Sequence, residues 1–232
     1  MTITIYIYFK KNTVSNINNY INLISFLLRS KENMILRSIT DKNLRLIWFD
    51  IETTGFNIFH HNIIEIAAVD NKGKEFSCLI KCNTSLPKKI TQITGITDEI
   101  LYQEGIEIID ALKKFREFLL DNQGNTTYLI GHNSYSFDIP FIKAQFMKYN
   151  LKFPSYESLD TMRIAQFIMP SEWSHSLNYL CQLFGIENKQ AHRALSDVYA
   201  TQAIYKNLII IYKSVFKTEV LSLNNIIKKT KF

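Results

Sequence analysis

The segment LRLIWFDIETTGF, residues 44–56, is the most informative part of the chain, because it joins an apolar run to two acids. Leu, Ile, Trp and Phe dominate its first half, which predicts a buried strand over residues 44–51. Asp50 and Glu52 lie two positions apart, so their side chains project from the same face of that strand. Burying two carboxylates beside apolar neighbours is unfavourable unless a cation compensates them. The segment therefore predicts a cation site at a strand end.

Two later blocks supply further acids and a histidine. Asp138 closes GHNSYSFD, follows the short apolar run YLIG and begins a helical pattern; alone it would read as an acid favoured at a helix N-terminus. In HRALSD, His192 precedes Asp197 by five positions. Four carboxylates and one imidazole are what two hard divalent cations and one proton acceptor require for phosphodiester hydrolysis. A solvent-facing strand end remains the alternative for any isolated Asp-x-Glu pair.

The apolar spacing outlines an α/β fold. Strand patterns over residues 44–51, 63–70 and 74–81 are joined by short turns and predict an antiparallel meander. A helical pattern over 106–119 and a strand at 128–131 follow, then a helix that begins near Asp138 and the segment SLDTMRIAQF. A long helix is predicted from Arg193 to Phe216. This order predicts a mixed sheet covered by helices.

The bulk composition is compatible with one catalytic domain and two tails. The chain has 232 residues, 47% of them hydrophobic, and a net charge of +6. The positive charge lies mainly in residues 1–31 and 213–232, so it is weak support for a nucleic-acid partner. Three cysteines without paired spacing predict reduced thiols in an intracellular protein. No run approaches the ~20 apolar residues of a spanning helix.

Three regions follow from these patterns. Residues 1–40 are predicted to be an N-terminal appendage or leader, residues 41–216 the catalytic domain, and residues 217–232 a basic tail. Three interpretations of the first region stay open: an organelle transit segment within residues 1–31, an accessory strand and helix, or upstream sequence before a start at Met34. The predicted localisation is cytoplasmic or nucleoid-associated, or an organelle if the leader is a transit segment.

The blocks together resemble the DEDDh branch of the DnaQ-like 3′–5′ exonucleases, a family that includes polymerase proofreading subunits, ribonuclease T and the three-prime repair exonucleases. The resemblance spans about residues 44–210. FDIETTGF, GHNSYSFDIPF and HRALSDVYAT are similar to the family's three motifs in order, and the histidine before the last aspartate is typical of this branch. ITGIT and SLDT are similar to two weaker family segments.

The resemblance implies a ribonuclease H-like sheet of three antiparallel and two parallel strands. It also implies a 3′–5′ exonuclease that uses two Mg²⁺ or Mn²⁺ ions and releases nucleoside 5′-monophosphates. By this resemblance Asp50 bridges both ions, Glu52 and Asp197 complete the first site, Asp138 helps to hold the second, and His192 is the general base.

The same resemblance implies a substrate-binding set around the first and second motifs. It consists of Thr53, Thr54, Gly55, Phe56 and Asn133. Phe56 is expected to offer an apolar surface to a base, because stacking of this kind tolerates any sequence. Asn133 is expected to support the turn of the second motif and is a candidate substrate contact.

Several alternatives stay open at the level of substrate and partner. The wording TTGF favours single-stranded or frayed 3′ ends of DNA, as in proofreading or repair, and the alternative is an exoribonuclease that trims RNA. A non-catalytic nucleic-acid-binding or polymerase-accessory module is the second alternative, and its usual sign would be a missing carboxylate. A DNA polymerase partner and a homodimer are both compatible with the resemblance, and no membrane association is expected.

Overall fold

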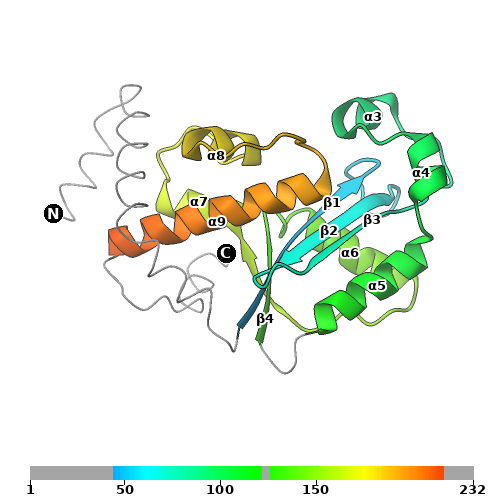
Figure 1. Ribbon diagram of the computed structural model, residues 1–232, viewed down its shortest axis with the longest axis horizontal. Helices are drawn as coiled ribbons and strands as arrows, with labels where there is room; N and C mark the ends of the chain where they lie inside the picture. The colour runs from blue at the N-terminus through cyan, green and yellow to red at the C-terminus, as the bar shows by residue number, and fades with distance from the viewer. Residues whose placement is uncertain (1–43, 122–125, 217–232) are drawn as a thin grey trace.

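A five-stranded mixed sheet forms the centre of the computed structural model, which describes residues 44–121 and 126–216 (Figure 1). Its strands lie in the order β3-β2-β1-β4-β5. β3, β2 and β1 are antiparallel, whereas β1, β4 and β5 are parallel. This confirms the predicted α/β sheet of the ribonuclease H-like type. The strands are β1 (Leu44–Thr53), β2 (Ile63–Asp70), β3 (Glu75–Leu79), β4 (Thr126–Gly131) and β5 (Glu157–Asp160).

Seven helices connect or cover these strands in the described ranges. The helix predicted over 193–216 is confirmed to within one residue, and the helix predicted to begin near residue 138 begins there. Three short helices, α3, α4 and α8, are additions to the predicted pattern. No helix in the described ranges is long and apolar enough to cross a bilayer. The helices are α3 (Lys88–Thr94), α4 (Asp98–Glu104), α5 (Ile108–Leu120), α6 (Asp138–Lys148), α7 (Thr161–Ile168), α8 (Leu177–Phe184) and α9 (Ala194–Phe216).

Helices cover both faces of the sheet, and the side chains of β1 alternate between them. Leu46 and Trp48 pack with residues of α7, α8 and α9, whereas Ile47 and Phe49 pack with α5 and α6. Figure 1 shows α9, in orange, crossing one face of the sheet while α5 and α6 lie on the other. Because successive strand residues point to opposite faces, the acids at positions 50 and 52 continue the series that faces α9.

The predicted boundaries of the domain remain a prediction. The appendage assigned to residues 1–40 and the basic tail assigned to residues 217–232 both lie outside the described residues. The described sheet and helices fall within the predicted catalytic region, residues 41–216.

Candidate active site

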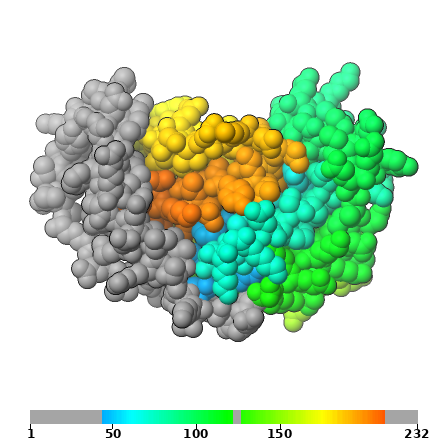
Figure 2. Space-filling model, in the orientation of Figure 1, coloured from blue at the N-terminus to red at the C-terminus, as the bar shows by residue number. Residues whose placement is uncertain are grey.

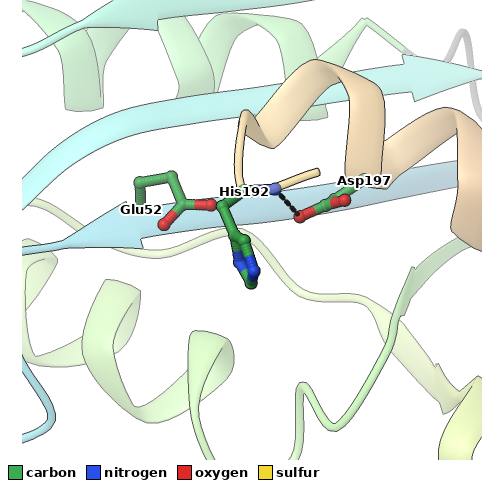
Figure 3. Close-up of side chains that lie close together, drawn as sticks. All are labelled: Glu52, His192 and Asp197. Carbon is green, nitrogen blue, oxygen red and sulfur yellow. Dashed lines mark hydrogen bonds between the residues drawn. The ribbon is translucent and has the colours of Figure 1, made fainter. Parts of the chain in front are cut away.

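One carboxylate of β1 meets the start of α9 at the end of the sheet. Glu52, His192 and Asp197 each offer one ligand atom, and these atoms all lie within 4.8 Å of one another. In Figure 3 the carboxylate of Glu52 points from β1 toward His192, and Asp197 projects from the first turns of α9. Carboxylate oxygens and an imidazole nitrogen at such spacing are a donor set that can hold a divalent cation.

Asp197 is held rigidly, whereas the ring of His192 is open to solvent. The backbone N–H of His192 donates to Asp197 Oδ2 at 3.0 Å, and Asn188 Nδ2 donates to Asp197 Oδ1 at 2.5 Å. Ser196 in turn donates to Asn188 Oδ1 at 2.6 Å. His192 itself has a left-handed backbone with a φ of 65°. The geometry thus fixes the carboxylate and leaves the imidazole accessible to a substrate.

Asp138 brings a further carboxylate to β1 from the start of α6. It is the first residue of α6 and is buried, and its Oδ1 accepts the backbone N–H of Ile51 at 3.2 Å. The last β1–β4 pair is Trp48 with Ile130, so Asp138 accepts from β1 beyond the end of that ladder. It therefore lies beside the two acids of the first motif.

The loop that carries Asp138 is anchored by a second buried carboxylate, Asp160, at the end of β5. Asp160 is fully buried and accepts backbone N–H groups of Asn133 at 3.0 Å and Tyr135 at 3.1 Å. It also accepts from Met162 at 3.0 Å and so caps α7. Asn133 has a φ of 60°, a backbone strain that these bonds stabilise. Sequence reasoning placed Asn133 in this turn but missed Asp160.

The acids of the site repel one another and are withdrawn from water. Burial, followed by repulsion from Asp138 and Glu52, raises the pKa of Asp50 well above its usual value. Burial and then Asp197 raise the pKa of Glu52 to about 8, and burial raises the pKa of Asp138 to about 7. Burial also raises the pKa of Asp197, although hydrogen bonds oppose it. A cation among these oxygens would favour the ionised forms and remove this cost.

The predicted substrate residues that follow Glu52 lie at the end of β1 and in the β1–β2 connection, which internal hydrogen bonds hold together. Thr53 Oγ1 donates to the carbonyl of Gly55 at 2.7 Å, and Thr54 Oγ1 accepts from the N–H of Asn62 at 3.0 Å. The ring of His61 approaches Gly55 so closely that a Cβ there would lie 2.6 Å from Nε2. Both threonine hydroxyls are thus engaged within the loop.

Phe56 is the exposed member of the predicted substrate set. Its side chain is 86% exposed, and its ring packs edge-on against Phe137 with centroids 5.9 Å apart. Phe137 immediately precedes Asp138, so this contact joins the first and second motifs. The space-filling view shows a hollow between α8 and the pair α3 and α4, with the N-terminal part of α9 at its floor (Figure 2). An apolar ring is therefore presented to solvent next to the acids.

Glu65 is a carboxylate of this region that sequence reasoning missed. It lies on β2 directly opposite Glu52 in the antiparallel pairing and is only 2% exposed. The signal in the sequence was a lone acid inside the apolar strand IIEIAAVD. An acid at such a position requires a partner, and the structure supplies one in Arg193, with Nη2 and Oε1 2.9 Å apart.

Comparisons with known proteins are consistent with this geometry. The chain is 37% identical over 157 residues to the PolC-type DNA polymerase III of Bacillus cereus and 34% identical over 163 residues to that of Mycoplasma genitalium. These matches cover 66% and 68% of this chain. They cover only 10% and 11% of the relatives, so the chain spans about a tenth of the length of the curated relatives it matches.

Solved structures share the fold. Escherichia coli Exonuclease I in complex with a dA16 oligonucleotide superposes with a TM-score of 0.65 at 20% identity, over 75% of this chain and 42% of that chain. Exonuclease I from Methylocaldum szegediense gives a TM-score of 0.61 at 21% identity, over 75% of this chain and 43% of that chain.

The match to a family model covers more than half of the chain. The family described as Exonuclease matches residues 47–205, a range that runs from β1 into α9 and contains all three motifs. Together with the motif order and the fold, this match shows that the chain belongs to the exonuclease family, as a DnaQ-like member.

Proposed function

We propose that this protein is a metal-dependent 3′–5′ exonuclease that removes nucleotides from single-stranded or frayed DNA ends. The observation that carries the proposal is the convergence of Glu52, His192 and Asp197 within 4.8 Å, with Asp138 close enough to Asp50 to raise the pKa of Asp50. Carboxylates gathered in this way are unfavourable unless a cation compensates their charge. Phosphodiester hydrolysis is a reaction in which such carboxylates hold divalent cations.

The donor set fits divalent cations of the Mg²⁺ or Mn²⁺ type, since hard oxygen ligands predominate. We assign Asp50 to both ion positions, Glu52 and Asp197 to the first, and Asp138 to the second. When bound, two such cations would activate a water molecule and stabilise the charge on the departing 3′ oxygen.

The remaining steps fall to side chains of the protein. His192 accepts a proton from the attacking water, because its ring is exposed beside the acids and an imidazole can exchange protons near neutral pH. Asp197 accepts the backbone N–H of His192 and so limits where the ring can lie. Phe56 offers an exposed ring for the terminal base, and Thr53, Thr54 and Gly55 connect it to Glu52 along the chain.

The relatives support DNA as the substrate class. The PolC-type relatives are DNA polymerases by name, and the Exonuclease I complex contains a dA16 oligonucleotide. We accordingly propose a 3′ end of DNA as the substrate and a polymerase-associated or repair context, with RNA trimming as the competing substrate class.

The decisive experiment is stepwise degradation of a 5′-labelled oligonucleotide. With Mg²⁺ or Mn²⁺ the protein should shorten single-stranded DNA from its 3′ end and release nucleoside 5′-monophosphates, and the Asp50→Asn variant should not. Matched RNA at one salt concentration tests the substrate class, because only RNA presents a 2′-hydroxyl. Faster RNA degradation would transfer the proposal to an exoribonuclease. Metal-independent binding without hydrolysis would favour the non-catalytic module instead.

A further inference from the structure

Glu65 is an acid in the site region that the proposed reaction does not use. Its carboxylate lies across the β1–β2 ladder from Glu52, immediately before the register shift between Glu52 and Thr53. Like charges directly opposite one another in an antiparallel pair are destabilising. A second carboxylate opposite a proposed metal ligand therefore requires a structural reason.

The partners of Glu65 all come from the start of α9. Arg193 donates to Oε1 through Nη2 at 2.9 Å, and its Nε lies 3.3 Å from each carboxylate oxygen. The backbone N–H of Ala194, the first residue of α9, donates to Oε2 at 3.0 Å. Glu65 thus accepts both a forked guanidinium and an otherwise unpaired N–H of the first helical turn.

These same contacts flank the two proposed site residues of α9. Arg193 directly follows His192, and its carbonyl accepts the N–H of Asp197 at 3.0 Å. A non-glycine residue such as His192 adopts a left-handed backbone only where surrounding contacts determine it. The clamp from Glu65 to Arg193 and Ala194 is one such set of contacts, and it ties this turn to the strand that pairs with β1.

We propose that Glu65 and Arg193 are a positioning pair that holds His192 and Asp197 in register with Glu52. This inference rests on the proposed exonuclease function. Arg193 acts through the carboxylate of Glu65 and makes no contact with the substrate, even though 39% of its side chain is exposed. Its charge offsets that of Glu65, so the clamp adds no net negative charge to the acids of the site.

Two conservative variants test the pair. Glu65→Gln keeps the volume and one acceptor but removes the charge, and Arg193→Lys keeps the charge but removes the fork. Each should lower kcat by roughly 10- to 100-fold with KM little changed, as is typical when a partner behind a ligand is lost. The double variant should be scarcely worse than either single variant, because both remove one interaction. Glu107→Gln, which alters the exposed pair with Lys81, is the matched control and should keep full activity.

Two measurements that need no nuclease activity separate this inference from the proposed function. Hydrogen exchange at the amides of His192 and Ala194 should accelerate in Glu65→Gln, whereas exchange at Trp48 in the centre of β1 should not. Mn²⁺ binding measured by calorimetry should weaken by about 10- to 100-fold. Both readouts remain valid if the wild-type protein proves to lack nuclease activity.

Two results would overturn the pairing. The first is unchanged exchange, Mn²⁺ affinity and kcat in both variants. The second is an Arg193→Lys enzyme with a raised KM and a salt dependence reduced by about one phosphate contact, which would place Arg193 on the substrate instead. If Glu65→Gln fails to fold, as judged by circular dichroism, Arg193→Lys carries the same measurements, because its side chain is partly exposed.

Discussion

The two ends of β1 both place buried acids beside the sheet, but they treat the negative charge in opposite ways. At the N-terminal end, Asp70 is 3% exposed and pairs with Arg45, which is 1% exposed, at 3.1 Å. Arg45 also donates to the carbonyl of Phe118 at 2.6 Å and lies over its ring. This end is a closed structural pair whose opposite charges compensate each other within the protein.

At the C-terminal end of β1, acidic side chains outnumber basic ones. Arg193 is paired with Glu65 there, but no Lys or Arg of the described residues forms an ion pair with the four acids of the motifs. All four of those acids have a raised pKa: Asp50, Glu52, Asp138 and Asp197. The contrast teaches that a buried acid alone indicates little, whereas a group of wholly or partly buried acids without compensating cations indicates a functional site.

The strongest test of this contrast is the Asp50→Asn variant. It should lower kcat by about a thousandfold or more, since a carboxylate that would hold both proposed cations would contribute several kcal/mol to transition-state stabilisation. Without metal the variant should be at least as stable as the wild type, because it removes a repelled charge. Urea unfolding in the presence of a chelator measures the stability. A variant that unfolds more easily than the wild type would contradict the comparison.

The opposite outcome is expected at the other end of the strand. Arg45→Met should lower the free energy of unfolding by about 3–5 kcal/mol, because it leaves the buried carboxylate of Asp70 without its cation. The paired variant Arg45→Met with Asp70→Asn should recover part of that loss. Urea unfolding of the wild type and of both variants measures these differences. An Arg45→Met variant as stable as the wild type would show that the pair contributes nothing.

The pH dependence of stability should come from the acids at the C-terminal end of β1. The pKa of Glu52 is raised from 4.5 to about 8, so the folded protein binds more protons than the unfolded chain across that window. The free energy of unfolding of the metal-free protein should therefore fall as the pH rises through it. Glu52→Gln should flatten the curve, and added Mg²⁺ should stabilise most at the alkaline end. A metal-free protein that becomes more stable across this window would refute the assignment.

The smallest effect is expected from an exposed ion pair near the N-terminal end of β1. Lys74 and Asp121 lie 2.5 Å apart, but their side chains are 55% and 47% exposed. Lys74→Gln should leave the midpoint of urea unfolding almost unchanged, because water screens such pairs. A loss as large as that of Arg45→Met would mean that burial is not what separates the two pairs.

Much of the fold could be predicted because its signals are local. Strand β1 is an apolar run, and helix α9 is long enough for its pattern to be read. The helices α3, α4 and α8 have seven or eight residues, too few to show the helical periodicity of apolar residues clearly. Ser176, at the N-cap of α8, is nevertheless a residue type that indicates the start of a helix.

The site was predictable to the extent that its residues lie in motifs. The structure brings Glu52, His192 and Asp197 together, and it places Asp138 against β1. The supporting acids were not predictable from local pattern. Asp160 serves a loop 27 positions away, and Glu65 serves a helix 128 positions away. Such roles depend on the tertiary fold, in which the partners meet only after the sheet is assembled.

The place of the last ligand in the chain has a consequence for biosynthesis. The ribosome makes β1 first and the turn with His192 and Asp197 long afterwards, once every strand of the sheet has emerged. A nascent chain that already contains its sheet therefore still lacks two of the groups proposed for cleavage. Translation that stalls before this turn would therefore yield a product whose sheet can form but whose proposed site is incomplete.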